Sequence, residues 1–225
     1  MLDVATEQGV RLVNRDRMWH STEGLQNWDP VWPDHAIRIL PGPSSVWLDA
    51  RGRQLPAPGL PGYDTLGTLE LLLKSRLGSG APGPVQDFMD HGDAFVIADT
   101  PPELVDGMNA LTGDDLLDRS AVESIIRARD NEMTNLYSKD AQAMGIRNSR
   151  RYLGDKITRT AKPHRILDPA HGPLIAVRLW IVTRKTLGGI QTDLTGRAMR
   201  ADGQSIPGLY AAVEAAGFGG GGAHG

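Results

Sequence analysis

The sequence predicts a protein of the α/β (α+β) class, in which short strands and loops alternate with a few helices. Three observations lead to this class. The 27 glycines and 15 prolines among 225 residues gather in residues 40–62, 78–84 and 217–225, which is more turn-forming sequence than a helical bundle carries. Residues 173–182 form an apolar run typical of a strand. Residues 100–103 and 120–123 carry helix-start signals.

The composition limits the cellular compartments and the classes of binding partner that we expect for this protein. A hydrophobic content of 40% is enough to bury a core, and a net charge of −3 gives no basic field for nucleic acid. The absence of cysteine removes disulfides, thiolate nucleophiles and Cys-ligated metals. The N-terminus lacks a secretory pattern, and the apolar runs are far shorter than the roughly 20 residues of a membrane span. We therefore expect a cytoplasmic protein without a membrane span or a nucleic-acid partner.

The first part of the chain reads as short elements joined by turns. Residues 3–14 predict the end of a helix, a turn at Gly9 and a strand. The apolar stretches 37–40 and 46–48 are separated by a Pro-Gly-Pro turn and predict a β-meander. Four tryptophans fall in this region, and they either pack a loop-rich subdomain or stack on a ligand. They are Trp19, Trp28, Trp32 and Trp47.

Three helices are expected next. Residues 66–77 are rich in helix formers and end before Gly78. Thr100, followed by two prolines and Glu103, predicts a capped helix that runs to about Leu111. Ser120 and Glu123 predict a second capping box. After it, apolar and basic residues follow helical spacing, namely Val122, Ile125, Ile126, Arg129, Met133 and Leu136.

Beyond the third helix the chain becomes basic and then returns to strands. A solvated helix face or an anion-facing site would explain the run of Lys and Arg between residues 139 and 165. Strands are predicted in residues 173–182, 190–194 and 208–212.

Two glycine patterns could carry chemistry. Thr186, Leu187, Gly188 and Gly189 lie between two predicted strands, where paired glycines permit either an ordinary tight turn or close approach to a flat ligand. Residues 217–222 formally match G-x-G-x-x-G, but no helix follows, so a flexible tail explains them equally well. The six histidines form no metal-binding pair, and no nucleophile elbow is present, so no metal site is predicted.

The string RKTLGGIQTDLTGRAMRADGQSIPGLYAAVEAAGFGGGGAHG, residues 184–225, resembles the C-terminal flavin-binding segment of a known superfamily. That superfamily contains fumarate reductase and succinate dehydrogenase flavoproteins and 3-ketosteroid dehydrogenases, the FAD-dependent oxidoreductase 2 type. Its pattern is T-[ML]-G-G-x-x-T-D, then D-G-x-x-I-P-G-L-Y-A-x-G-E, then a glycine-rich stretch and H-G. The upstream stretches RMWHSTEGLQNWDPVWP, RILPGPSSVWLDARGRQLPAP and KPHRILDPAHGPLIAVRL look like a bacterial subgroup called FAD-binding dehydrogenases.

The resemblance implies FAD as cofactor and assigns residues by position. Those that would contact the flavin ring, the ribityl chain or their surroundings are Thr186, Leu187, Gly188, Gly189, Thr192, Glu214 and Ala215. Arg184 stands where fumarate reductases carry a substrate-binding histidine, and His224 matches the family's H-G. Arg150 lies in the basic run, near where fumarate reductases place a proton-donating arginine. Arg184, His224 and Arg150 are therefore the catalytic candidates.

The resemblance also implies a domain plan. Residues 1–18 would be a remnant of an FAD-binding, Rossmann-like domain, and 19–165 a capping domain that looks shortened around 78–84. Residues 166–225 would be the C-terminal part of the FAD-binding domain. The N-terminal G-x-G-x-x-G unit that holds the FAD pyrophosphate and the family's closing helix are not found. Val213 stands where the family has a glycine.

On this basis we expect an FAD-dependent oxidoreductase, a dehydrogenase or reductase acting on CH–CH groups of a small hydrophobic, steroid-like molecule. The sequence does not indicate its electron partner. The alternative is a non-catalytic truncated remnant, or a gene-model fragment, that binds no FAD.

Overall fold

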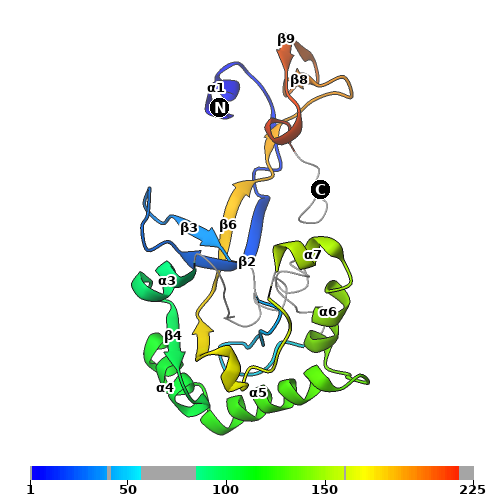
Figure 1. The fold of residues 1–225 in the computed structure, drawn as a ribbon. Coiled ribbons are helices and arrows are strands. Elements are labelled where there is room, and N and C mark those ends of the chain that lie inside the picture. Colours follow the sequence, from blue (N-terminus) through cyan, green and yellow to red (C-terminus); the bar gives the residue numbers. More distant parts are fainter. Residues whose placement is uncertain (1, 40–41, 57–84, 160, 218–225) are drawn as a thin grey trace. The chain divides into compact units, whose positions relative to one another are not determined.

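The computed structural model describes residues 2–39, 42–56, 85–159 and 161–217. The helix predicted in residues 66–77 lies outside these ranges. The chain forms two compact units, and we describe each by itself. The split unit contains Met1–His20 and Thr183–Gly225, and the inserted unit contains Ser21–Val182. The chain passes between the units in two strands, β2 (Met18–Gln26) and β6 (Trp180–Thr186) (Figure 1).

The split unit is built from short antiparallel pairs. Helix α1 (Leu2–Glu7) is followed by a turn at Gly9, whose φ is +76°, and by β1 (Leu12–Val13), as predicted. Strand β1 pairs antiparallel with β7 (Gly189–Ile190). Strands β8 (Arg197–Met199) and β9 (Ser205–Tyr210) form a hairpin, and the 3-10 helix η2 (Val213–Ala215) follows. A small apolar cluster that includes Ala5, Val10 and Ile190 forms the core of this unit.

The inserted unit combines two small sheets with four-turn and shorter helices. Strand β2 lies between β3 (Ala36–Arg38) and β6, and β4 (Phe95–Ala98) pairs antiparallel with β5 (Leu174–Val177). Its helices in chain order are α3 (Val85–His91), α4 (Pro101–Thr112), α5 (Arg119–Thr134), α6 (Ala141–Ser149), α7 (Leu153–Thr158) and the 3-10 helix η1 (Pro169–His171).

The predicted strands are corrected in three places. The run 173–182 is not one strand, because β5 ends at Val177 and β6 begins at Trp180. Residues 46–48 do not join a meander, since only Leu48 bridges to Gln54 and β3 pairs with β2 instead. Strand β2 was missed because residues 21–25 are all buried, including Thr22 and Glu23. Burial on both faces removes the alternation that signals a half-exposed strand.

The unit boundaries also differ from the expected domain plan in residues 166–182. This stretch falls in the inserted unit, since its strand β5 pairs along its whole length with β4, from Phe95 opposite Val177 to Ala98 opposite Leu174.

The first residues of α4 and α5 show which local sequence signals were sufficient to predict where a helix begins. Helix α4 has the predicted capping box, with Thr100 and Glu103 each accepting a hydrogen bond from the other's backbone N–H, and it ends at Gly113 with φ +71°. Helix α5 begins earlier than predicted, because the Asp118 carboxylate accepts from the backbone N–H of Ala121 at 2.8 Å. Ser120 is inside the helix and donates its hydroxyl to Asp118. The carboxylate is the stronger acceptor for the free amides, so it takes the cap position.

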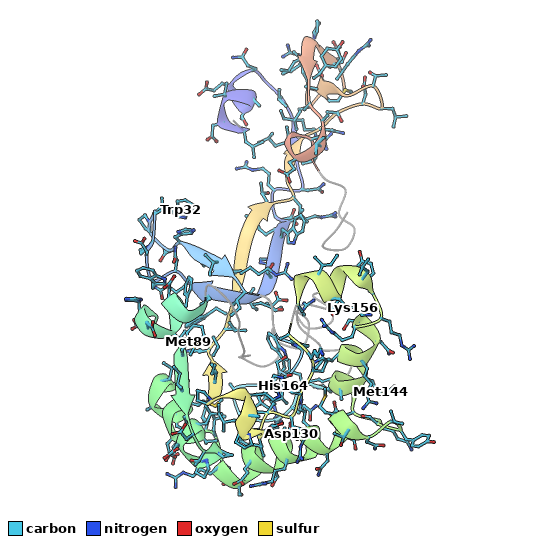
Figure 2. All side chains as sticks on the ribbon, in the orientation of Figure 1. Trp32, Met89, Asp130, Met144, Lys156 and His164 are labelled. Atoms are coloured by element: carbon cyan, nitrogen blue, oxygen red, sulfur yellow. The ribbon has the colours of Figure 1, made fainter. Side chains whose placement is uncertain are left out.

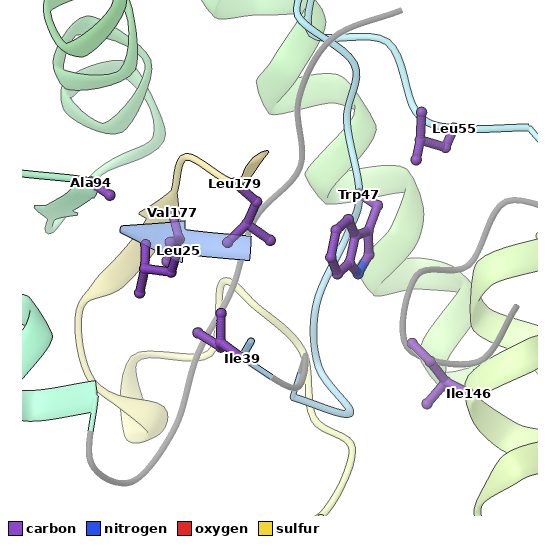
Figure 3. Close-up of a cluster of buried hydrophobic side chains, with 8 residues drawn as sticks. All are labelled: Leu25, Ile39, Trp47, Leu55, Ala94, Ile146, Val177 and Leu179. Carbon is purple, nitrogen blue, oxygen red and sulfur yellow. The ribbon is translucent and has the colours of Figure 1, made fainter. Parts of the chain in front are cut away.

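Trp47 stands at the centre of the main hydrophobic core of the inserted unit (Figure 3). Its side chain is fully buried, together with those of Leu25 and Ile146. Gln142 on α6 fixes the loop that carries this tryptophan, because its side-chain amide bonds to both the N–H and the C=O of Trp47 and to the C=O of Leu55. Trp28 and Trp32 are instead partly exposed and stack on His91 and His35.

A second buried polar group joins α5 to the segment that leads into β5. The Asp130 carboxylate accepts from the backbone N–H groups of Ile166 at 2.7 Å and Leu167 at 2.8 Å. Arg129, also fully buried, donates to Asp130 and to the carbonyl of His164. Figure 2 shows Asp130 and His164 close together. Burial lowers the pKa of Arg129, and the Asp130 charge opposes this shift.

The basic run serves partly to hold helix ends. Arg147 donates to the carbonyls of Glu132 and Met133 at the end of α5. Arg150 and Arg159 both pair with Asp155 on α7. These cations meet the carbonyls that a helix C-terminus leaves without intrahelical partners, so part of the run has a structural cause.

We expect Asp130→Ala to lower the free energy of unfolding by about 3–5 kcal/mol, because it leaves the buried Arg129 charge without its counter-ion and two part-buried backbone N–H groups without their acceptor. The matched control is Glu123→Ala on the same helix, which removes the partner of the exposed Arg127 and should cost no more than about 0.5 kcal/mol. Urea unfolding followed by circular dichroism measures both. Equal losses in the two variants would contradict the role of Asp130.

Candidate functional site

The segment Thr186 to Gly189 leaves β6 in a turn tied to the loop after β1. The Thr186 hydroxyl accepts from the N–H of Gly188 at 2.8 Å and donates to the carbonyl of Arg17 at 3.3 Å. The same carbonyl accepts from the N–H of Leu187 at 2.9 Å. The threonine is therefore required locally, since its one hydroxyl closes the turn and joins it to the N-terminal segment.

Both glycines of this turn are buried, and they are needed for close backbone contact and not for positive φ, which neither adopts. A Cβ on Gly188 would lie 2.7 Å from the carbonyl oxygen of Asn14. A Cβ on Gly189 would lie 2.6 Å from the carbonyl oxygen of Ala215. These distances are shorter than van der Waals contact, so any side chain would force the three segments apart. We call this contact of residues 14–17, 186–190 and 215–217 the glycine junction.

The third segment of the junction follows η2. Ala216 forms a parallel bridge with Ile190, whose carbonyl accepts from the N–H of Gly217 at 2.9 Å. A Cβ on Gly217 would collide with Val13. Glu214 is exposed and Ala215 is partly buried. The junction thus brings the predicted ring-contacting residues 186–189 beside the predicted ribityl-contacting residues 214 and 215.

Val213 explains why the family carries a glycine at this place. Its φ is +54°, a left-handed conformation that costs a β-branched residue free energy and that glycine adopts freely. Its side chain is 78% exposed, so it gains little packing in return. The departure from the family pattern therefore places a β-branched residue in a left-handed backbone and adds strain.

The T-D pair of the motif has separate tasks. Thr192 makes a backbone bridge to Ala198 and is partly buried. Asp193 holds the turn into β8, accepting from the hydroxyl and N–H of Thr195 and from the N–H of Arg197. The hydrogen bond from the Thr195 hydroxyl is the main cause that lowers the pKa of the Asp193 carboxyl.

Sequence reasoning did not single out Gln191, which lies between the junction and this pair. Its side-chain oxygen is buried and has no hydrogen-bond partner among the residues described. An acceptor left without a donor costs free energy that a ligand N–H would recover. A polar residue two positions after the paired glycines was the available signal.

The three catalytic candidates do not all fall within one described site. Arg184 belongs to β6, but its side chain lies outside the described part. His224 lies beyond residue 217, where the described ranges end. Arg150 lies in the inserted unit, where it donates to the Asp155 carboxylate at 3.0 Å and to the carbonyl of Arg159 at 2.6 Å. These bonds give its guanidinium group hydrogen-bond acceptors within the protein, without a ligand. Its catalytic role stays a prediction.

Two absences concern the described ranges only. No helix there has the length and apolarity needed to cross a membrane. Those ranges also hold no cluster of three or more His, Cys, Asp or Glu side chains suited to a metal ion.

The glycine junction lies at the segment for which the sequence predicts flavin contact, and comparison with known families agrees with a flavoprotein. The family described as FAD binding domain matches residues 1–225. The chain belongs to this FAD-binding oxidoreductase family, as the motif at residues 186–193 predicted, and FAD is the family's cofactor.

Two curated proteins of this family are similar to the chain along its whole length. A KsdD-like steroid dehydrogenase of Mycolicibacterium smegmatis is 49% identical over 264 residues, and one of Mycobacterium tuberculosis H37Rv is 48% identical over 265 residues. Each match covers 100% of this chain but only 48% or 47% of the relative, so the chain spans about half the length of these proteins. The aligned regions are longer than the 225 residues of this chain, so the relatives carry internal residues that it lacks.

Two solved structures share the fold. A 3-ketosteroid delta1-dehydrogenase from Sterolibacterium denitrificans, in complex with 1,4-androstadiene-3,17-dione, has a TM-score of 0.54 at 15% identity. It is matched over 93% of this chain and 39% of its own. The open conformation of a flavocytochrome c3 fumarate reductase has a TM-score of 0.53 at 15% identity, over 96% of this chain and 34% of its own. The α/β fold predicted from sequence is thereby confirmed.

Val213→Gly should raise the free energy of unfolding by roughly 1 kcal/mol, because glycine adopts the left-handed backbone without a Cβ penalty. The matched control is Val4→Gly on α1, also exposed, which should lower it by up to about 1 kcal/mol because glycine disfavours helix. Thermal unfolding measures both. A loss of stability in Val213→Gly would contradict the strain assigned to this position.

Acid should weaken the turn that Asp193 holds. Because its folded pKa is lowered from 3.8, its contribution is complete above about pH 4 and is lost as pH falls through the folded pKa. We expect the melting temperature of the wild type to fall more steeply below pH 4 than that of Asp193→Asn. Parallel curves for the two proteins between pH 6 and pH 2 would refute this.

Proposed function

We propose that the protein containing this chain is an FAD-dependent dehydrogenase that acts on a CH–CH bond of a steroid-like molecule. The observation that supports this most directly is the glycine junction, which lies at the family's flavin motif. The KsdD-like steroid dehydrogenases, matched along all of this chain, support the substrate class. They also favour an enzyme over a non-catalytic remnant.

In this proposal the split unit holds the isoalloxazine end of FAD. Residues 186–189 would contact the ring, Thr192 would lie beside it, and Glu214 with Ala215 would approach the ribityl chain. Gln191 would offer its buried side-chain oxygen to a flavin N–H. FAD, when bound, supplies hydride transfer at its ring.

The protein's share of the reaction is orientation and proton handling. Arg184 and His224 are our candidates for holding the substrate or moving a proton, because they occupy motif positions on either side of the flavin segment. The inserted unit, which includes residues 166–182, would be the cap over the substrate. Arg150 would support that cap through Asp155.

FAD retention tests the proposal. After incubation with FAD and desalting, we expect the purified chain to keep a flavin absorption band near 450 nm, as flavoproteins generally do. Gly188→Val should lose it, because the side chain would push Asn14 away and open the junction. Gln191→Leu should keep its fold and bind FAD about 5- to 10-fold more weakly, the effect of one lost hydrogen bond.

Gly203→Ala is the control for glycine replacement in the same unit. It also strains a backbone with positive φ, but nothing lies within 4 Å of the added Cβ, so flavin binding should be kept. Circular dichroism must show that each variant is folded. A folded wild-type chain that retains no flavin would overturn the proposed role of the split unit within this chain.

A further inference from the structure

The inserted unit contains a cavity of about 280 Å³ between α4, α5 and β5. Aliphatic side chains form most of its wall, including Leu104 and Met108 from α4, Val122 and Ile126 from α5, and Leu174 from β5. Cavities of about 150 Å³ with such walls stay dry and take up small aromatic molecules. This cavity is larger than that, and it belongs to one unit, so its shape does not depend on how the two units are placed.

One part of the cavity wall is polar. Ser44, His164 and His171 line it. The two imidazole rings stack with centroids 3.9 Å apart. Two hydrogen bonds fix the backbone of His164, because its carbonyl accepts from the buried Arg129 at 2.9 Å and its N–H donates to the Ser44 hydroxyl at 2.8 Å. These groups are therefore held in place before any ligand arrives.

The hydrogen bonds of His164 indicate which groups remain for a ligand. Its Nδ1 lies 3.0 Å from the carbonyl of Lys162 and 3.0 Å from the Ser44 oxygen. A carbonyl can only accept, so Nδ1 carries the proton, and in the neutral ring Nε2 is then an acceptor. The Ser44 oxygen accepts from His164, which leaves its own hydrogen to donate. Within the polar wall, Ser44 thus offers one donor and His164 one acceptor.

The charge nearby favours a neutral ligand. The carboxylate of Asp168 lies 3.9 Å from Nε2 of His171, which lines the cavity, and a carboxylate behind this ring disfavours an anionic ligand. An uncharged hydroxyl can use both the donor and the acceptor, and an uncharged carbonyl can use the donor, without burying a charge.

We propose that this cavity binds a small, flat, apolar molecule with a hydroxyl or carbonyl oxygen, and that it does so without the flavin. The apolar body lies against α4, α5 and β5; a ligand hydroxyl bonds to Ser44 or His164, and a ligand carbonyl accepts from Ser44. This site goes beyond the proposed function, because it lies wholly inside the inserted unit and uses none of the flavin motif. The chemical class, an apolar alcohol or ketone, is one to which steroids also belong.

The test uses 2-naphthol as an intrinsically fluorescent probe and naphthalene as its analogue without oxygen. We expect the full chain, free of FAD, to bind 2-naphthol with one-to-one stoichiometry and at least 5-fold more tightly than naphthalene. Ala161 is exposed and lines the cavity, so Ala161→Trp should block entry and weaken 2-naphthol binding at least 10-fold. Ala128→Trp, at an exposed α5 position outside the cavity lining, should leave it unchanged.

His164→Phe should keep a ring for stacking on His171 and lose the preference for 2-naphthol over naphthalene. If a variant fails to fold, ¹³C-methyl spectra of the wild type decide instead: 2-naphthol should shift the methyl signal of Met108, which lines the cavity, and not that of Met144 on α6. Absence of binding, or equal binding in Ala161→Trp and wild type, would overturn the proposal. Gly188→Val should still bind 2-naphthol, so this site and the flavin proposal can fail independently.

Discussion

Backbone contact without side chains is the constraint on which the split unit depends. At Gly188 and Gly189, the chain lies so close to Asn14 and Ala215 that a Cβ would fall within 2.7 Å of a carbonyl oxygen. This contact lets β1 pair with β7 and brings the segment after η2 beside Ile190. Three pieces of chain, two of them almost 200 residues apart, are thus fixed by the smallest residue available.

The inserted unit is held by a different kind of interaction. Its loops are irregular, and polar side chains from helices satisfy their backbone groups. Gln142 does so for Trp47 and Leu55, and Asp130 for Ile166 and Leu167. Because unpaired buried amides cost more than the net gain of an average hydrogen bond, these few side chains determine where the loops can lie. The loop 42–46 and the segment 161–166, which line the cavity between α4, α5 and β5, are joined by the hydrogen bond from the N–H of His164 to the Ser44 hydroxyl.

The family relationship indicates which cofactor the chain binds, whereas the geometry of the glycine junction explains why particular motif residues are needed. Membership of the FAD-binding family rests on residues 1–225, whereas the chain covers about half of its steroid dehydrogenase relatives. The junction explains physically why the family motif needs two glycines and a threonine. It also explains Asp193 as the acceptor that holds a turn, a role that the motif alone does not distinguish from contact with the cofactor.

The sequence by itself determined the family, the cofactor, the α/β class and the helix beginning after Thr100, because these depend on local chemistry or on motif spacing. It placed Ser120 at the start of a helix where the Asp118 carboxylate accepts from the backbone amide instead. It missed strand β2, because burial on both faces leaves no alternation of apolar and polar residues. It assigned residues 166–182 to the FAD-binding part, because the pairing of β4 with β5 cannot be seen in the sequence. Only the tertiary structure decided that Gly188 and Gly189 serve close contact instead of positive φ, that Arg150 bonds to Asp155, and that Gln191 keeps a buried acceptor unpaired. These properties depend on which distant segments meet, and neighbouring residues in a sequence carry no record of that.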